Sequence, residues 1–208
     1  MTSLRHAVLT AADTIEAAQE DLGALDRVAG DGDHGVTMAT AARNVRARLR
    51  AAPDLAGADL LREVALGVAS VGGASGPIYA TALLRIAAVV PDTPVTPATL
   101  LAAAEAAEDG IMALGKAKPG DKTLLDALHP LVESLRASVA RGSDLPSAVS
   151  EAAAAAQNGA ASTADMVATL GRASRLGERS RGSADPGATS LAVIVSALAA
   201  SYAHDRTG

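Results

Sequence analysis

The sequence contains no cysteine, no tryptophan and no phenylalanine, and aromatic residues make up only 1% of its 208 residues. Without cysteine, the chain has no disulfide, no thiolate metal ligand and no thiol nucleophile. With so few aromatic side chains, the core has to be built from Ala, Leu, Val and Ile, which favours packed helices over a sheet sandwich. The length suits one domain, which we expect to span residues 1–208.

Positive charge and long apolar runs are also scarce. The net charge of −5 gives no support for a nucleic-acid partner. No uninterrupted apolar stretch is long enough to cross a membrane. The first twenty residues contain acidic side chains and lack the apolar run of a signal peptide. We therefore expect a cytoplasmic protein that binds neither nucleic acid nor membrane.

Apolar residues recur at helical spacing along almost the whole chain, and no segment alternates with the period of a half-buried strand. The pattern predicts eight helices, with an interruption of the seventh near residues 157–159. Short connections favour an antiparallel up-and-down arrangement, so the predicted fold class is all-α. The eight helices are expected near residues 4–22, 36–50, 61–71, 78–89, 97–114, 124–139, 146–170 and 191–202.

Alternate loops lie at the same end of an up-and-down arrangement. The loops after the second, fourth and sixth helices are ordinary turns with Pro and Asp. The loops after the first, third, fifth and seventh helices hold nearly all the clustered Gly, Asp and Lys, and much of the Arg. The sequence therefore predicts a functional site at one end, built from these four loops.

Three carboxylates lie close together in the first of these loops: Asp26, Asp31 and Asp33. Carboxylates this close repel one another unless a cation neutralises them. Mg²⁺ prefers hard oxygen ligands and leaves positions for water or phosphate oxygens. A lone D-G-D would be interpreted as turn and N-cap residues. Here the additional Asp26 and the three other converging loops favour a metal site.

Three familiar motifs fail on inspection. The letters of residues 30–35 fit the dinucleotide pattern G-x-G-x-x-G, but no strand precedes them. Residues 110–116 fit most of a P-loop, but Ala117 replaces the required Ser or Thr. An EF-hand counted from Asp31 would need a carboxylate at its twelfth position, which is Ala42.

The remaining loops offer groups that could face a phosphate. The helix start after the aspartates presents backbone N–H groups, with Thr37 adding a hydroxyl, while His34 could contact phosphate or merely begin the helix. Ser75 could donate to phosphate, although its loop, taken alone, is better explained as a plain turn between helices with Pro77 at the start of the second one. The third loop carries lysines that are more commonly solvated. The fourth, residues 171–189, is long and carries four arginines that could cover a nucleotide.

Taken in order, these segments resemble a known family, the ADP-binding L subunit of dihydroxyacetone kinases with its DAK2-type domain. The resemblance covers nearly the whole chain and implies an eight-helix antiparallel barrel with Mg²⁺–ADP at one end. Each motif alone is weak, and together they are specific. The motifs are D-x-x-x-x-D-x-D-H-G from Asp26, GGASGP at 72–77, GDKTLLDAL at 120–128, GRASRLGERS at 171–180 and DPGA at 185–188.

The resemblance also implies roles for individual residues. Asp26, Asp31 and Asp33 would coordinate Mg²⁺. Leu124 stands where relatives often have Met, which is a tolerable apolar exchange. The nucleotide, ADP or ATP, would be surrounded by His34, Gly35, Val36, Thr37, Ser75, Gly76, Gly115, Leu124, Arg172, Asp185, Pro186 and Gly187.

By resemblance, the chain would be a phosphotransferase subunit acting with a K-type subunit that holds dihydroxyacetone. In the bacterial multi-subunit version, a phosphohistidine protein, the M-type donor, uses phosphoenolpyruvate to rephosphorylate the bound ADP. Alternatives at this point are an ATP-dependent kinase subunit for another short sugar, a nucleotide-occupied regulatory module that binds a transcription factor, and a simple divalent-cation-binding protein. The donor, the sugar and the oligomeric state, including a homodimer, stay open.

Overall fold

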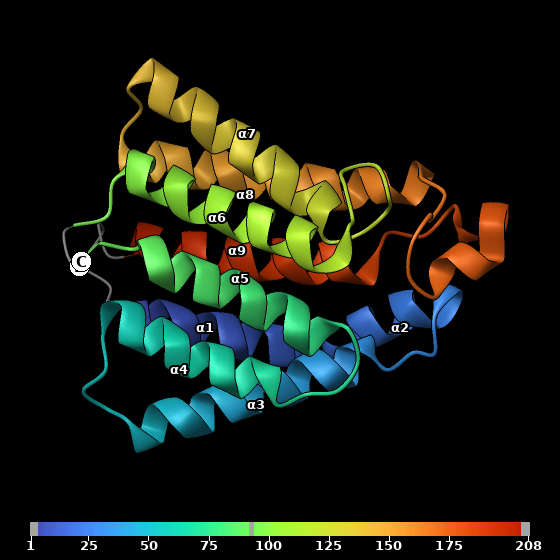
Figure 1. Cartoon of the computed structure of the whole chain (residues 1–208), viewed down its shortest axis with the longest axis horizontal. Coiled ribbons are helices and arrows are strands. Elements are labelled where there is room, and N and C mark those ends of the chain that lie inside the picture. The colour runs from blue at the N-terminus through green and yellow to red at the C-terminus, as the bar shows by residue number, and fades with distance from the viewer. Residues whose placement is uncertain (1–3, 92–93, 205–208) are drawn as a thin grey trace.

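The computed structural model describes residues 4–91 and 94–204, and these residues form a closed ring of helices (Figure 1). No strand occurs within the described ranges, so the all-α prediction is confirmed. The elements are α1 (Leu4–Ala17), α2 (Gln19–Ala29), α3 (His34–Ala51), α4 (Gly57–Ala69), α5 (Ser75–Val89), α6 (Pro97–Gly115), α7 (Leu125–Arg141), α8 (Leu145–Ser162), the 3₁₀ turns η1 (Thr163–Asp165) and η2 (Ala173–Ser180), and α9 (Pro186–His204).

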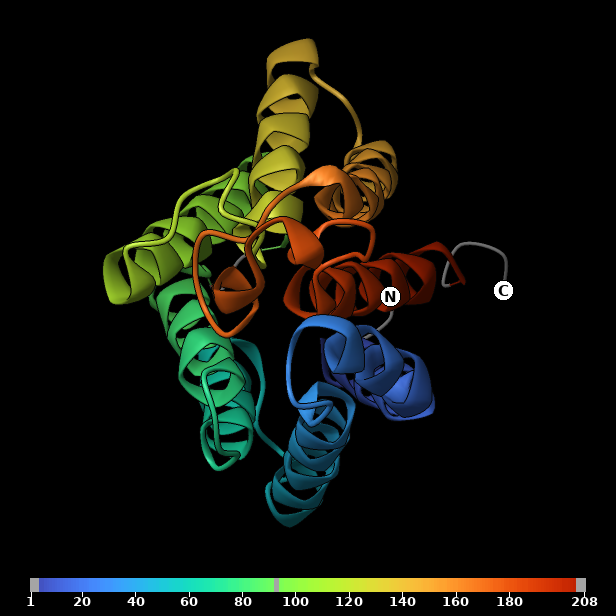
Figure 2. The same ribbon diagram turned by 90° about the vertical axis from the view of Figure 1, so that its right-hand side faces the viewer.

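Eight of these helices, α1 and α3 to α9, form the wall of an up-and-down barrel. Each packs against the next along the chain, and α9 packs against α1, which closes the ring (Figure 2). The short helix α2 extends beyond α1 at one end of the barrel. The predicted eight-helix antiparallel barrel is therefore confirmed, with α2 as an addition to it.

The core is built from small and branched aliphatic side chains, as the lack of Phe and Trp requires. Leu22, Leu49 and Leu60 are each only 1% exposed, and alanines fill many helix contacts. At Gly159 a Cβ atom would lie 2.3 Å from the carbonyl oxygen of Asp126, so this glycine lets α8 approach α7 closely. The expected interruption at residues 157–159 is therefore wrong, because α8 runs unbroken through them.

Several helix boundaries differ from the predicted ones. The predicted first helix divides at Ala18, and α2 continues to Ala29, so Asp26 lies on a helix rather than in a loop. The predicted seventh helix ends at Ser162 instead of near residue 170. There the hydroxyls of Ser162 and Thr163 donate to the carbonyls of the preceding turn, which satisfies the end of the helix. Residues 92–93 of the predicted turn after α5 lie outside the described residues, as do both ends of the predicted 1–208 domain.

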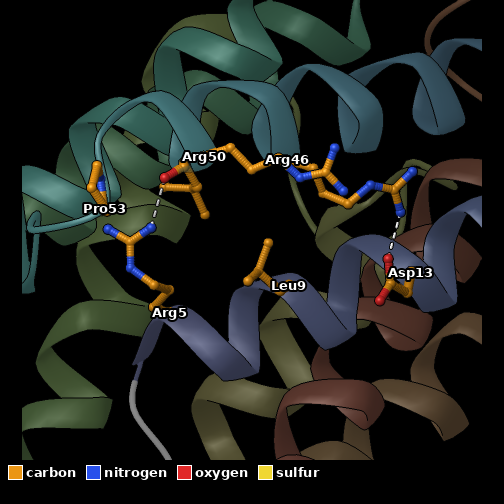
Figure 3. A pocket seen from close by; sticks show the side chains of 7 residues that line it. Arg5, Leu9, Asp13, Arg46, Arg50 and Pro53 are labelled. Carbon is orange, nitrogen blue, oxygen red and sulfur yellow. Dashed lines mark hydrogen bonds and ion pairs between the residues drawn. The ribbon is translucent and has the colours of Figure 1, made fainter.

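A hollow between α1 and α3 lies toward the end of the barrel away from the unusual loops. It is lined by Arg5, Leu9, Asp13, Arg46, Leu49, Arg50 and Pro53 (Figure 3). The Arg5 guanidinium donates to the carbonyl oxygens of Leu49 at 2.8 Å, Ala52 at 2.7 Å and Leu55 at 3.0 Å. Arg5 therefore caps the carboxyl end of α3 and ties it to the turn that follows.

None of the described helices has the length and apolar character needed to cross a bilayer.

Candidate functional site

The four unusual loops converge at one end of the barrel, as the sequence predicted. They lie on the right of Figure 1, opposite the plain turns. Figure 2 looks onto this end and shows residues 163–185, the connection from α8 to α9, crossing the middle of the ring. We call residues 163–185 the flap. Direct contacts between side chains join the loops to one another.

The three aspartates form a compact acidic cluster. Asp26, Asp31 and Asp33 each offer an oxygen atom, and these atoms lie within 4.8 Å of one another. Asp26 is partly buried on the last turn of α2, and its Oδ2 accepts a hydrogen bond of 3.1 Å from the backbone N–H of His34. The side chains of Asp31 and Asp33 are 51% and 59% exposed. One carboxylate therefore holds the start of α3, while two face outward.

The donor set of this cluster fits a hard divalent cation. Three carboxylate oxygens at this spacing can bind one ion and leave its outer positions for water or phosphate. Positive charge already faces them, because Arg172 at the tip of the flap forms an ion pair with Asp31 and lies 3.8 Å from Asp33. The acidic cluster therefore lies beside an arginine side chain, which can also bind anions.

A close approach of two backbones positions the start of α3 at the cluster. A Cβ atom on Gly35 would lie 2.0 Å from the carbonyl oxygen of Gln19 and 2.7 Å from the backbone nitrogen of Gly23. Only glycine fits there, and its absence of a side chain lets the first turn of α3 rest against α2. The N-terminal N–H groups of α3 consequently lie beside the three carboxylates, where a cation-bound anion would sit.

His34 is buried at the centre of a hydrogen-bond network that joins three of the loops. Its Nε2 lies 3.0 Å from Ser190 Oγ, and its Nδ1 lies 3.4 Å from Ser75 Oγ. The hydroxyl of Tyr79 lies 2.8 Å from the same Ser190 oxygen, which also donates to the carbonyl of Gly187 at 3.0 Å. Burial lowers the pKa of His34, although Asp26 acts in the opposite direction. Burial therefore disfavours the charged form of the His34 ring.

Tyr79 and Ser190 were not among the residues selected from the sequence. Tyr79 is one of only two aromatic residues in the chain, on a helix otherwise rich in Ala and Leu, which is a signal that could have been used. Ser190 lies in the early part of α9 and carries no recognisable motif of its own. Burial raises the pKa of Tyr79 well above its usual range, so its hydroxyl stays protonated as a hydrogen-bond donor.

Asp185 begins the last helix and faces the third loop. Its carboxylate accepts a hydrogen bond of 2.7 Å from the backbone N–H of Ala188, as an N-cap does. Burial raises the pKa of Asp185 to about 6. Next to it, a Cβ on Gly187 would lie 3.7 Å from Leu124. The predicted residues Leu124, Asp185, Pro186 and Gly187 are thus brought together.

The third loop is held by its own carboxylates. Asp126 accepts hydrogen bonds from the backbone N–H groups of Gly120 at 2.5 Å and Thr123 at 2.7 Å. Asp121 accepts one of 2.6 Å from the hydroxyl of Thr169 on the flap, and this bond lowers the pKa of Asp121. Lys122, expected to be solvated like other surface lysines, is instead only 4% exposed.

The long loop predicted at residues 171–189 contains regular structure. The 3₁₀ turn η2 occupies Ala173–Ser180, with a kink at Gly177, and α9 already starts at Pro186. Of its arginines, Arg172 reaches the acidic cluster and Arg181 pairs with Glu178 within the flap.

Four predicted site residues remain, namely Gly76, Val36, Thr37 and Gly115. Gly76 lies in the first turn of α5 beside Ser75, with a Cβ there 2.6 Å from the carbonyl of Val71. Val36 is 54% exposed on the first turn of α3, and Thr37 follows it. Gly115 ends α6 and is exposed, and a Cβ there would meet nothing within 4 Å. Gly115 is therefore the predicted residue least connected to the others.

Comparisons with known proteins agree with this arrangement. A family model described as the DAK2 domain matches residues 28–200. The chain is 40% identical over 189 residues to the PEP-dependent dihydroxyacetone kinase, ADP-binding subunit DhaL, of Escherichia coli K12, covering 90% of each chain. It is 38% identical to the L-erythrulose kinase of Pectobacterium atrosepticum, covering 97% of this chain but only 35% of that enzyme.

The solved structures give the same answer. The crystal structure of the dihydroxyacetone kinase of C. freundii in its native form matches with a TM-score of 0.73 and 29% identity, over 94% of this chain and 33% of that one. A second structure of that kinase, in complex with AMP-PNP and Mg²⁺, matches with a TM-score of 0.69. This chain thus spans about a third of the length of these larger kinases. On the family match, the identity and the shared fold, the chain belongs to the DAK2 domain family.

Proposed function

We propose that this chain is the nucleotide-carrying phosphotransferase subunit of a dihydroxyacetone (glycerone) kinase. It uses Mg²⁺-bound ADP or ATP to pass a phosphoryl group to dihydroxyacetone held on a separate K-type subunit. The observation that carries the proposal is the cluster of Asp26, Asp31 and Asp33 within 4.8 Å at the start of α3. The E. coli relative, which the chain matches over 90% of its length, is named as an ADP-binding subunit.

The residues of the site divide the work of holding a nucleotide. The three aspartates hold Mg²⁺, which neutralises charge on the phosphate oxygens. The first turn of α3 donates backbone N–H groups to a phosphate, and Arg172 adds a positive charge from the flap. His34 fixes this helix start through the contacts of its ring nitrogens with Ser190 and Ser75. Catalysis then comes from positioning and charge neutralisation.

The sugar is selected outside this chain. Relatives named as dihydroxyacetone and erythrulose kinases share this domain, yet it covers only about a third of the erythrulose enzyme. We therefore place the substrate-holding function on the K-type partner. The phosphoryl donor is a phosphohistidine protein fed by phosphoenolpyruvate, since the E. coli relative is named PEP-dependent. We place the protein in the cytoplasm together with this phosphohistidine donor.

A second candidate is an ATP-dependent kinase subunit for another short sugar. The 38% identity to the L-erythrulose kinase favours this alternative specifically. The two candidates differ in the donor and the sugar, and they share the same nucleotide site.

Reconstitution separates these functions. The chain alone is expected to phosphorylate no small sugar. Together with a K-type subunit, it should transfer label from phosphoenolpyruvate, through the phosphohistidine protein, to dihydroxyacetone, while free ATP substitutes poorly. Efficient transfer from free ATP, or to erythrulose instead, would favour the second candidate. Transfer from neither donor across a panel of short ketoses and aldoses would contradict both and favour a nucleotide-occupied regulatory module.

A further inference from the structure

The flap has a narrow base where its two arms lie side by side. The backbone N–H of Gly182 donates to the carbonyl of Ala164 at 2.8 Å, and that of Ala168 donates to the hydroxyl of Ser180 at 2.9 Å. The Arg181 guanidinium also donates to the carbonyl of Asp165. Residues 164–169 and 180–182 are therefore joined, and the tip, residues 170–179, projects from them as a closed loop.

One side chain from outside the flap bonds to both arms of this base. Lys122 lies in the connection between α6 and α7, and its Nζ donates to the carbonyl of Met166 at 3.2 Å and to the carbonyl of Ser180. The two acceptors stand on opposite arms. The side chain is buried, and burial lowers the pKa of Lys122, while nearby Asp185 acts in the opposite direction.

The side chain of Lys122 is buried, although the backbone at this residue adopts an energetically unfavourable conformation. Lys122 has φ of +61°, in the left-handed region that residues with a side chain rarely occupy. Its neighbour Asp121 makes a second link to the flap, through the 2.6 Å bond from Thr169 and a 3.2 Å backbone bond between the same residues. The third loop thus holds the flap firmly at its base.

The tip of the flap meets the acidic cluster through Arg172. A loop pinned at its base and touching a ligand site at its tip transmits its position to that site. We propose that Lys122 is a positioning residue, which pins both arms of the flap so that Arg172 stays over the nucleotide. The role rests on the proposed function, because it assumes that the acidic cluster and the start of α3 bind the nucleotide beneath the tip.

The proposal predicts faster release of nucleotide when the ammonium is removed. Lys122→Met keeps the apolar stem and loses both hydrogen bonds. Dissociation of a fluorescent ADP analogue with Mg²⁺, chased with excess ADP, should accelerate by about tenfold or more, since bonds to a charged group are typically worth that factor. Trypsin should also cleave at the tip arginines faster. Lys118→Met, at an exposed lysine of the same loop, is the matched control and should leave both rates unchanged.

The absence of cysteine allows a rescue experiment on the same position. Lys122→Cys introduces the only thiol of the chain, which 2-bromoethylamine alkylates to restore an ammonium at the reach of Nζ. The protein is alkylated in denaturant and refolded, with wild type treated alike. Before alkylation the variant should release nucleotide fast, and afterwards it should return toward the wild-type rate. Lys122→Met fills nearly the same space without the ammonium, so a merely space-filling role would leave its release rate at the wild-type value.

Each outcome decides the proposal. Equal dissociation and cleavage rates for wild type and Lys122→Met would overturn it. So would a Lys122→Cys protein that loses its helical circular dichroism until alkylated, because the ammonium would then support the barrel itself. If wild type binds no nucleotide, the proposed function fails instead. Flap cleavage in the nucleotide-free proteins then still decides whether Lys122 pins the flap.

Discussion

Replacing Asp31 by asparagine tests the acidic cluster most directly. Asp31→Asn keeps the shape of the side chain and removes one negative oxygen ligand. The Asp31 side chain is 51% exposed and its partner Arg172 is 52% exposed, so their ion pair contributes about 0–1 kcal/mol at most. The nucleotide-free variant should therefore melt close to wild type. The loss should appear only in the presence of Mg²⁺ and nucleotide.

The size of that loss follows from ligand linkage. Nucleotide at about a thousand times its dissociation constant stabilises the wild-type fold by roughly 4 kcal/mol. Loss of a metal ligand should weaken binding about a hundredfold or more, since even outer-shell partners of a metal cost up to that factor. At the same nucleotide concentration the stabilisation then falls to roughly 1.4 kcal/mol. For a domain of this length the shift in Tm falls from roughly 8–16 °C to roughly 3–6 °C.

The assay is a thermal melt with and without Mg²⁺–ADP. Wild type, Asp31→Asn and Asp54→Asn are compared, where Asp54 is an exposed aspartate in the turn at the other end of the barrel. Asp54→Asn should show the full wild-type shift. Melts with Mg²⁺ alone distinguish a nucleotide site from a simple cation site. A variant that shifts as far as wild type would refute the assignment of the cluster to the metal.

Three further results are expected. Gly35→Ala should destabilise the fold by about 1–3 kcal/mol or more in denaturant titrations, because its Cβ would meet the backbone of α2, while Gly72→Ala, whose Cβ meets nothing within 4 Å, should not. The tip of the flap should be protected from protease by bound nucleotide and exposed once a chelator removes the metal, and equal cleavage in both states would show a passive linker. Asp185→Asn should stabilise the nucleotide-free protein at pH 7 to 8. The folded pKa of Asp185 is raised from 3.8 to about 6, so the stability from its protonated form is present below pH 4 and lost as pH rises through 6. The difference, at most about 3 kcal/mol, should vanish near pH 4 in melts across that range, and a gap that persists there would contradict the burial argument.

Much of the architecture could be predicted from periodicity alone. The even helix count and the sorting of plain and unusual loops were enough to place Asp31, Ser75 and Arg172 at one end, because alternation of loops is a property of the topology. The helix boundaries were harder to predict. The break expected near Gly159, for example, does not occur, because α8 continues through this residue. A glycine in a sequence reads as a helix breaker, whereas here it serves the approach of α8 to the carbonyl of Asp126, a contact between distant residues.

The interior of the candidate site was harder to predict for the same reason. Lys122 looked like a solvated lysine because its carbonyl acceptors lie 44 and 58 residues further along the chain. Ser190 became visible only once α9 placed it beside His34, which is 156 residues away. Nothing local to either position announces such partners. The acidic residues were found because they cluster in sequence as well as in space.

Because α1 and α9 pack against each other, the chain could begin at another helix of the ring without losing this contact. The start of α1 and the end of α9 both lie at the end of the barrel away from the site, on adjacent helices. A circularly permuted chain could join them there and open instead at the turn between α7 and α8, where Gly142 and Asp144 cap the two helices. The wall contacts and the four site loops would be preserved in such a chain. A further domain attached at this end would likewise lie away from the end of the barrel that carries the acidic cluster.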